Sequence, residues 1–480
     1  MTSRGPLGLA AIGTSLACFL LTSFLGPSVM QPALAGEDGH PPFSLDVHPS
    51  PYLVIGLVVA GIVTGTAGIG LCLHAVRHGW RCRPRALMGA GLVAAAAFAV
   101  MPPVGSGDHL NYAAYGRMAV LGHDPYTTRA VDLPGDPVIG EVEEWRSTPS
   151  VYGPIATAQE AFASWTGGDS MRLTVFVLSL VNALAFALTA WILYRTARSD
   201  ERRLRAALLW TCNPLLLFHL VAGAHNDVLA IAPMALALAV AGRWAWLAGA
   251  LVGAGAALKL PAALVGGGPA WVWFKERSYV RLAALGAGAA IVAGTAFVSA
   301  GSHAFDQVKR ASNSVSWATP WHLLDPLTHR NVIKIGFLLL MVALVVLLVR
   351  ALPREPAEDE LARSRRIAAA LVLAWLFAAP YELPWYDGFA WAVLVLIPWS
   401  RFDAILLAHT GLLSLGYLPA RDPKLIDLPG SLSWLVTVVR PWVIPLALTG
   451  VLAALIALCL RRRPVPEHAP PPRAAAGSPG

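Results

Sequence analysis

Residues 172–194 read RLTVFVLSLVNALAFALTAWILY, a stretch in which Arg172 is the only charged residue. A transmembrane helix needs about 20 consecutive, predominantly apolar residues, so this stretch predicts a helix that spans a bilayer. The composition agrees, because 56% of the 480 residues are hydrophobic and 13% are charged, whereas soluble domains carry roughly 25% charged residues. These values argue against a chain of soluble domains and predict an integral protein of a lipid bilayer.

Similar apolar stretches recur along the chain. They lie at 7–29, 52–74, 87–103, 206–221, 227–242, 245–258, 261–274, 282–300, 332–350, 367–380, 388–399, 403–419 and 440–460. Several are shorter than a full span, and we expect these to be tilted, re-entrant or half-length. The pattern predicts an all-α fold, a polytopic transmembrane helical bundle of about 12–14 spans.

The net charge of +8 is placed as in a membrane protein and not as in a nucleic-acid-binding protein. Basic residues cluster between apolar stretches, at 77–85, 195–205, 275–281, 350–366 and 461–463, with Arg243 and Arg401 in two further turns. Alternation of the spans puts all of these turns on one side, which the positive-inside rule identifies as the cytoplasm. We therefore expect a multi-pass protein of the plasma membrane with both termini in the cytoplasm and no nucleic-acid partner.

The two ends of the chain differ from its centre. Residues 1–35 contain one apolar stretch and then Ala33-Leu34-Ala35, so they predict either an uncleaved first helix or a signal-like segment. Residues 36–463 form the polytopic domain, and the Pro/Ala-rich residues 464–480 predict a disordered cytoplasmic tail. The five cysteines are scattered without metal-ligand or CxxC spacing, so the sequence predicts neither a zinc site nor a disulfide framework.

Three longer segments face outward in this topology, at about 103–170, 301–331 and 380–388, with a short tip at 223–227. Binding and catalytic residues concentrate on such loops, and most of the unusual polar residues of the chain lie there. We therefore expect the active site at the extracytoplasmic face.

Asp108 follows the third span in the string GSGDHLNY (105–112). The glycines allow a tight turn, and an Asp before a helix is a good N-cap. A carboxylate at the membrane surface is also suited to deprotonate a substrate hydroxyl. From spacing alone, capping and general-base catalysis both remain open for Asp108.

Two further groups of charged residues stand at the ends of apolar stretches. His225, Asn226 and Asp227 occupy a tip with no room for a real loop, and Lys259 is the only charge between Arg243 and Lys275. Ionisable groups at such positions are costly unless they are paired or functional. The alternatives are a helix cap for the tip and snorkelling for Lys259, whereas the functional hypothesis assigns Lys259 to an anionic lipid headgroup.

Aromatic residues accompany these groups. The string PYELPWYD (380–387) adds Glu382 and Asp387 to Trp385 and Tyr386, while Tyr126 and Tyr152 each stand in a Pro- and Gly-containing turn of the first long loop. Interfacial anchoring explains the aromatic rings and turn formation explains Pro and Gly. Anchoring does not explain the two carboxylates.

The ordered set of these motifs resembles one family. The set comprises GD and YAAYG within 107–116, DPY (124–126), YGP (152–154), HND (225–227), AALK (256–259) and PWYD (384–387). Over roughly residues 85–400 the chain is similar to the actinobacterial polyprenol-phosphomannose-dependent α-1,6-mannosyltransferases, within the GT-C superfamily of polyprenol-dependent glycosyltransferases. It differs in its shorter length and in carrying His109 where a small or polar residue is expected.

The resemblance implies an enzyme that moves mannose from polyprenyl-phosphate-mannose to a mannan or glycolipid acceptor by inversion. It places the general base at Asp108 and implies binding of donor or acceptor by the other singled-out residues. They are His109, Tyr126, Tyr152, His225, Asn226, Asp227, Lys259, Lys309, Arg310, Glu382, Trp385, Tyr386 and Asp387. Lys259, with Lys309 or Arg310, is the candidate to offset the charge of the departing phosphate.

The sequence contains no GxGxxG or P-loop pattern, which agrees with an activated lipid donor and no nucleotide cofactor. The sequence predicts no metal site. The alternative hypothesis is a divalent cation bound through Asp227. Two other functions remain open. One is a GT-C enzyme with another sugar or linkage (arabinosyl, glucosyl or α-1,2-mannosyl), and the other is a lipid or solute transporter.

Overall fold

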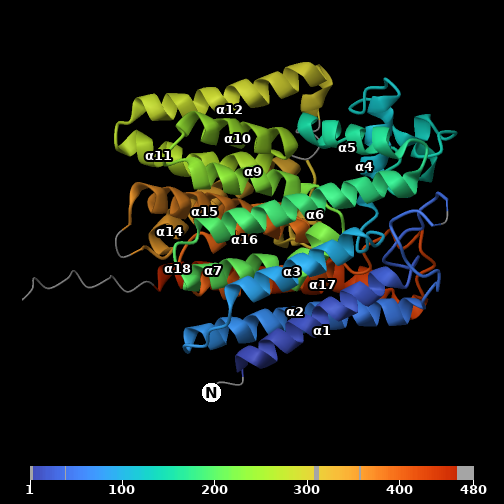
Figure 1. Ribbon diagram of the computed structural model, residues 1–480, viewed down its shortest axis with the longest axis horizontal. Helices are drawn as coiled ribbons and strands as arrows, with labels where there is room; N and C mark the ends of the chain where they lie inside the picture. The colour runs from blue at the N-terminus through green and yellow to red at the C-terminus, as the bar shows by residue number, and fades with distance from the viewer. Residues whose placement is uncertain (1–3, 38, 307–312, 356–357, 462–480) are drawn as a thin grey trace, which may run out of the picture.

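The computed structural model describes residues 4–37, 39–306, 313–355 and 358–461. Among these residues the regular structure is helical, and no strand is formed. The helices lie side by side along the length of the molecule (Figure 1). The prediction of an all-α polytopic bundle is confirmed.

Seven helical stretches of the described residues are long and apolar enough to cross a membrane. They are α1 (Arg4–Phe24), α2 (Pro51–Arg77), α6 (Met171–Thr196), Asp200–Ala222, α12 (Tyr279–Ala300), α14 (Arg330–Ala351) and Gly430–Leu460. The fourth of these joins α7 (Asp200–Ala206), α8 (Pro214–Leu216) and two π-helical turns, η3 (Ala207–Thr211) and η4 (Leu217–Ala222). The seventh contains η10 (Gly430–Leu432), η11 (Leu435–Val443) and α18 (Ile444–Leu460).

The other helices are shorter. They are α3 (Pro84–Ala99), α4 (Asp108–Val120), α5 (Pro154–Gly167), α9 (Asp227–Val240), α10 (Ala245–Leu258), α11 (Gly267–Lys275), α15 (Glu360–Ala378), α16 (Asp387–Val395) and α17 (Phe402–Gly416). Short 3-10 turns lie at η1 (Ala130–Asp132), η2 (Ile139–Glu141), η5 (Leu260–Gly266), η6 (Ser302–Phe305), η7 (Pro320–Leu323), η8 (Asp325–Leu327) and η9 (Pro384–Tyr386). The stretch 261–274, which was expected as a span, instead forms the 3-10 turn η5 and the short helix α11. The preceding helix α10 ends before it because Pro261 cannot continue a helix.

Burial separates the helices into an outer and an inner set. In the most apolar part of α12 only 11% of residues are buried, and in that of α14 only 17%, whereas all residues are buried in the most apolar part of Asp200–Ala222. Exposed apolar side chains such as Ile291 on α12 and Leu339 on α14 would be unfavourable in water. The outer helices therefore present the surface expected to face lipid, and the inner ones form the core.

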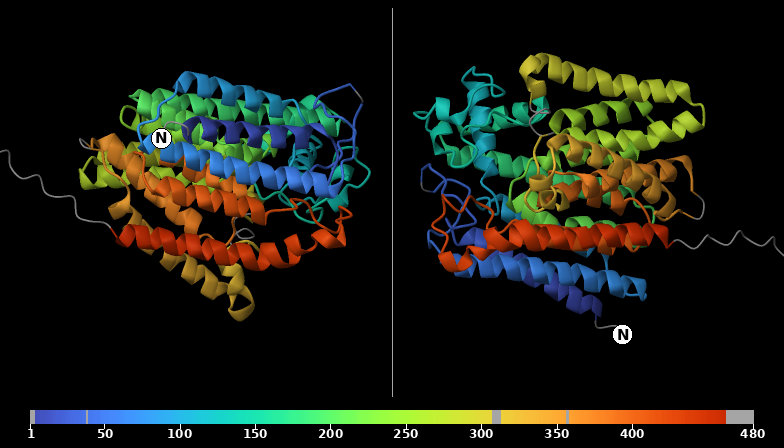
Figure 2. Two further views of the ribbon diagram at one scale, coloured as in Figure 1. Left: turned by 90° about the horizontal axis from the view of Figure 1, so that it is seen from below. Right: turned by 180° about the vertical axis from the view of Figure 1, so that it is seen from behind.

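The connecting segments gather at one end of the bundle. Figures 1 and 2 show that the chain between α1 and α2, the helices α4 and α5, and the chain between α17 and α18 all lie at this end. Hydrogen bonds join them, from Gly105 N to Met30 O (2.8 Å) and from Asp422 N to Glu144 Oε1 (2.7 Å). We call this the loop end, and the opposite end, where α6 turns into α7, the turn end.

A buried ion pair ties three inner helices together at the turn end. Arg205 on α7 donates to both oxygens of Asp403 on α17, at 2.9 and 2.6 Å, and neither side chain has exposed surface. The same guanidinium donates to the carbonyl of Leu394 on α16 at 2.7 Å. Such a pair stabilises the fold only as a unit, because either partner alone would be an uncompensated buried charge.

We expect Asp403→Asn to lower the free energy of unfolding by about 3–5 kcal/mol, since it leaves Arg205 charged and buried. The double variant Arg205→Met/Asp403→Leu removes both charges and should be closer to the wild type. Thermal unfolding of the detergent-purified chain measures both effects. A double variant as unstable as the single one would contradict the role of this pair.

Candidate functional site

Four segments from different parts of the chain converge at the loop end. They are the start of α4, the tip between η4 and α9, the break between α10 and η5, and the segment 380–387. The first two are joined by a hydrogen bond from Val104 N to Ala222 O (2.8 Å). Gly105, with φ +94°, makes the turn that lets α4 start beside this tip. The structure thereby brings Asp108 and His225 together.

Asp108 is the first residue of α4, and the N-cap is Gly107. Its backbone N–H donates to Ser106 Oγ at 3.0 Å, and its carboxylate caps no backbone N–H of α4. The side chain is 17% exposed and lies 3.9 Å from His225 Nε2. Burial, with a smaller contribution from the nearby Glu144 carboxylate, raises the pKa of Asp108 to about 7. The carboxylate is thus accessible and titrates near neutral pH.

His225 is held rigidly beside Asp108. Its Nδ1 lies 2.5 Å from the backbone carbonyl of His219, so Nδ1 carries the proton that is donated there and Nε2 keeps its lone pair. The ring stacks on Trp385 with a centroid distance of 3.5 Å and an angle of 16°. Among the described residues Nε2 has no hydrogen-bond partner. An unoccupied acceptor therefore faces the Asp108 carboxyl.

Lys259 is paired. Its Nζ lies 2.6 Å from Asp227 Oδ1, and the Asp227 side chain has no exposed surface. The ammonium also lies over the ring of Tyr386, 4.1 Å from its centroid, and 6.0 Å from that of Tyr152. The lysine side chain keeps 17% of its surface exposed. Its cation is therefore oriented from one side by a carboxylate and two rings, with part of it left accessible.

A glycine explains how Tyr152 reaches this cation. A Cβ on Gly153 would lie 2.1 Å from the carbonyl oxygen of Ala257, so only glycine allows the loop to approach the end of α10. Gly153 N donates to Leu258 O at 3.2 Å in this contact. The Tyr-Gly-Pro turn thus packs against the end of α10, directly before Lys259.

Asn226 leads to a residue that the sequence interpretation missed. Its Nδ2 donates to Oε1 of Glu160 at 3.3 Å, and Glu160 on α5 is fully buried. Burial raises the pKa of Glu160 to about 8, so this carboxyl is mostly protonated at neutral pH. The available signal was a single acidic residue in the otherwise uncharged sequence of α5.

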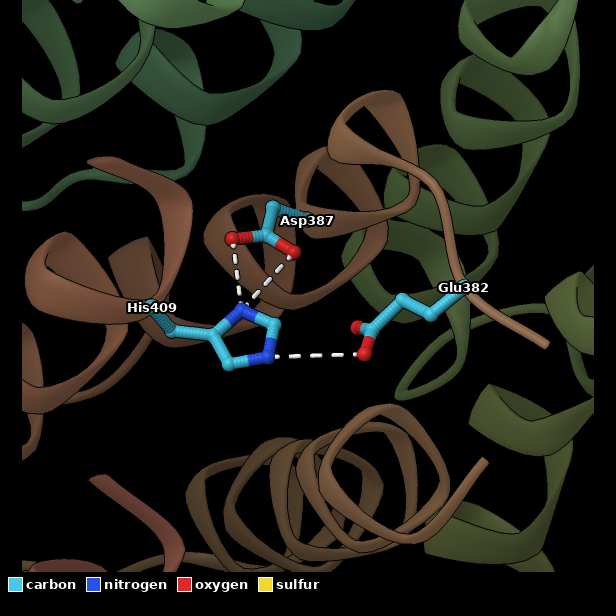
Figure 3. A group of neighbouring side chains, drawn as sticks. All are labelled: Glu382, Asp387 and His409. Atoms are coloured by element: carbon cyan, nitrogen blue, oxygen red, sulfur yellow. Dashed lines mark hydrogen bonds and ion pairs between the residues drawn. The ribbon is translucent and has the colours of Figure 1, made fainter. Parts of the chain in front are cut away.

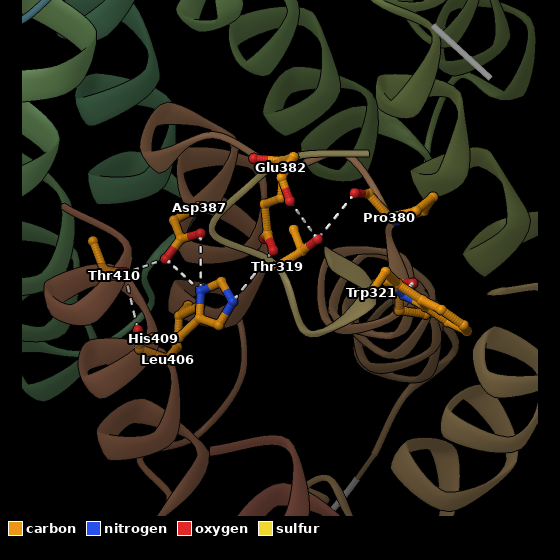
Figure 4. A network of polar contacts seen from close by, with 10 residues as sticks. Thr319, Trp321, Pro380, Glu382, Asp387, Leu406, His409 and Thr410 are labelled. Atoms are coloured by element: carbon orange, nitrogen blue, oxygen red, sulfur yellow. Dashed lines mark hydrogen bonds and ion pairs between the residues drawn. The ribbon is translucent and has the colours of Figure 1, made fainter. Parts of the chain in front are cut away.

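The segment 380–387 is fixed by a second buried network, drawn in Figures 3 and 4. His409 on α17 lies between two carboxylates, with Nδ1 3.0 Å from Asp387 Oδ2 and Nε2 3.4 Å from Glu382 Oε2. Thr410 Oγ1 donates to Asp387 Oδ2 at 2.5 Å. His409 and Thr410 were not singled out in the sequence, because their helix follows the pattern of an ordinary apolar span.

Glu382, Asp387 and His409 have the donor types of a metal site, and one donor atom of each lies within 4.8 Å of the others. The two carboxylates, however, face opposite nitrogens of the ring (Figure 3). Each carboxylate thus already has a ring nitrogen of His409 as its partner. A bridging imidazolium, which donates to both carboxylates, fits the geometry better.

The other predicted site residues make different contacts or lie outside the described residues. The hydroxyl groups of Tyr126 and Thr157 share a hydrogen bond of 3.0 Å. Tyr126 also lines an open pocket of about 360 Å³ together with His123 and Asp124. His109 is fully buried on α4, and neither of its ring nitrogens has a hydrogen-bond partner among the described residues. Lys309 and Arg310 lie outside the described residues.

Residues 11–275 match the family model described as "Alpha-(1->6)-mannopyranosyltransferase, N-terminal domain". The chain is 30% identical over 165 residues to an alpha-(1->6)-mannopyranosyltransferase A of Corynebacterium glutamicum, a match that covers 34% of each protein. It is 27% identical over 337 residues to the protein of that name from Mycobacterium tuberculosis, covering 65% of this chain and 64% of the relative.

A probable alpha-(1->6)-mannopyranosyltransferase of Mycolicibacterium smegmatis is 36% identical over 139 residues, which cover 28% of this chain and 25% of the relative. The chain thus covers less than two thirds of the length of each of these relatives. No solved structure matches it. Because the family model covers more than half of the chain, from α1 through the Lys259 region to α11, the chain belongs to the α-(1→6)-mannopyranosyltransferase family.

Proposed function

We propose that this protein is a membrane mannosyltransferase that moves mannose from polyprenyl-phosphate-mannose to a glycan or glycolipid acceptor, forming an α-1,6 linkage by inversion. The observation that carries the proposal is that, at one end of an apolar bundle, the accessible carboxylate of Asp108 lies beside the tip whose Asp227 orients the cation of Lys259. Family membership and the names of the relatives supply the sugar and the linkage.

In this reaction the acceptor hydroxyl oxygen attacks the anomeric carbon of the donor. Its proton passes to the carboxylate of Asp108, and the bond between the anomeric carbon and the phosphate oxygen breaks in the same step. A general base works best with a pKa close to the operating pH, which agrees with the pKa of about 7 for Asp108. One displacement on a β-linked donor gives an α-linked product.

The leaving group is the phosphate of the polyprenyl chain, on which negative charge develops. Lys259 is the candidate to stabilise this charge, because a preorganised cation in a water-poor site needs little reorganisation during the reaction. Asp227 and Tyr386 hold the ammonium in place before the donor binds. Asp227 then acts by orienting Lys259, and this pairing makes it a poor candidate to bind a divalent cation.

The other residues divide into supporting and binding roles. Trp385 is buried against His225, and Tyr386 lies under the Lys259 ammonium, so we assign both to positioning these two groups for the donor. Tyr126 with Asp124 and His123 lines the pocket of about 360 Å³ at the same end, and we assign this pocket to the acceptor chain. The gathering of the long connections at one end supports an extracytoplasmic site, with the basic turns at the cytoplasmic side.

Membranes that contain the protein should transfer radiolabel from polyprenyl-phosphate-mannose to an oligomannoside acceptor. Asp108→Asn should reduce this transfer by about 10²–10⁴-fold, because the amide cannot accept the proton. Asp132→Asn is the matched control, since Asp132 lies in the same long segment in a surface ion pair with Arg129 and should retain activity.

Transfer from another polyprenyl-phosphate sugar, with none from the mannosyl donor, would refute the proposed donor. Near-normal transfer by a folded Asp108→Asn protein would leave the enzyme assignment standing and remove Asp108 from the role of base.

Lys259→Met alone would leave Asp227 buried and unpaired, and such a change destabilises a protein by about 3–5 kcal/mol. The double variant Lys259→Met/Asp227→Asn removes both charges and isolates the role in binding. We expect its KM for the donor to rise about tenfold or more, from the loss of a charge-assisted contact with phosphate.

The matched control is Asp227→Asn, which keeps the cation and should keep the KM within a few-fold of the wild type. Kinetics at saturating acceptor, with protein amounts normalised, measure these values. A wild-type donor KM in the double variant would show that Lys259 does not bind the phosphate.

A further inference from the structure

A second charged pocket lies at the turn end, opposite the candidate site. It is formed where α6 turns into α7, where α15 begins and where α16 ends. Its lining includes Arg198, Arg202 and Arg365, with Glu355 and Asp359 as the acidic residues. None of these residues takes part in the proposed transfer reaction.

The carboxylates do not neutralise all three arginines. Arg202 is paired with Glu355 at 2.8 Å. Arg198 lies 3.7 Å from Asp359, with both side chains more than half exposed, so this contact contributes little. Arg365 forms no ion pair with any described residue, and the pocket therefore carries an excess positive charge.

Two guanidinium nitrogens in this pocket also lack hydrogen bonds. Nε of Arg365 and Nη1 of Arg202 are buried and have no partner among the described residues. A buried charged donor without an acceptor is costly. Water could satisfy the hydrogen bonds but would add no negative charge to a pocket with three arginines and two carboxylates, whereas an anion with several oxygens does both.

The size and the walls of the pocket narrow the choice of anion. Its volume is about 80 Å³, enough for one phosphate group and too small for a nucleotide. Leu193, Val395 and Leu396 add apolar wall beside the arginines. The pocket lies at the helix ends of an apolar bundle, where the headgroups of the bilayer would lie, and basic pockets between transmembrane helices bind anionic headgroups.

We propose that Arg198, Arg202 and Arg365 form a binding site for the phosphate group of an anionic phospholipid. The bound phosphate bridges the turn between α6 and α7, the helix α7 and the helix α15, beside the end of α16. The helix α16 connects the two sites, because it begins at Asp387 in the candidate site and ends beside this pocket. The lipid would therefore stabilise the bundle without touching the reacting groups.

The test uses the full chain purified in detergent, with thermal unfolding followed during titration with phosphatidylglycerol or with the net-neutral phosphatidylcholine. Phosphatidylglycerol should raise the melting temperature saturably, and phosphatidylcholine should have a much smaller effect. Arg365→Gln should weaken the apparent Kd for phosphatidylglycerol about tenfold or more, through loss of a charged donor.

Arg350→Gln is the matched control, because Arg350 is exposed at the same end on α14 and does not line the pocket. Equal stabilisation of Arg365→Gln and the wild type, or of both proteins by both lipids, would overturn the proposal. A saturable effect of inorganic phosphate alone, equal to that of the lipid, would assign the pocket to a soluble phosphate and refute the lipid.

Native mass spectrometry of the wild-type chain provides a measure that needs no variant. Retention of phosphatidylglycerol adducts in preference to phosphatidylcholine supports the site, and equal retention contradicts it. These outcomes are independent of mannosyl transfer, so failure of either proposal leaves the other standing.

Discussion

The contact between Lys259 and Asp227 is the interaction on which the candidate site depends. A carboxylate with no exposed surface is stable at a helix start within an apolar bundle only if a cation compensates it. The pair fixes the end of α10 against the start of α9, which in turn places the tip with His225 beside α4. Loss of Lys259 alone would therefore leave Asp227 uncompensated and disturb the position of the histidine that faces Asp108.

Around this pair lie several buried polar groups, each with a partner from a distant part of the chain. Glu160 on α5 accepts from Asn226, and His409 on α17 bridges Glu382 and Asp387. Trp385 then stacks on His225, and Tyr386 lies under the Lys259 ammonium. The positions of His225 and Lys259 are thus supported by buried polar contacts from α5 and α17.

Much of this arrangement could be predicted from the sequence. The length of the apolar stretches predicted an all-helical membrane fold, which is confirmed, and the ordered motifs predicted the family, which the family match confirms. Asp108, Lys259 and the tip at 225–227 stood out because charges beside apolar stretches are rare. Their roles in binding and catalysis remain proposals.

The pairing of these residues could not be predicted. Lys259 appeared to be a solitary charge, because its partner lies 32 positions away and the contact depends on how α9 and α10 pack. Glu160 and His409 lie in helices whose patterns are those of ordinary structural segments, so only the packing reveals their contacts. The helices are also less regular than the apolar stretches suggested, since proline breaks and π-helical turns divide the inner ones.

The dependence of kcat/KM on pH tests the central claim, that Asp108 acts as the base, most directly. Its pKa is raised to about 7, and a base acts only when deprotonated. The donor is a phosphodiester that ionises at far lower pH, so it adds no titration in this range. The account predicts that kcat/KM for mannosyl transfer rises about tenfold per pH unit below pH 7 and levels off above it. A profile that is flat from pH 5 to 8, or that falls as the pH rises through 7, would contradict it.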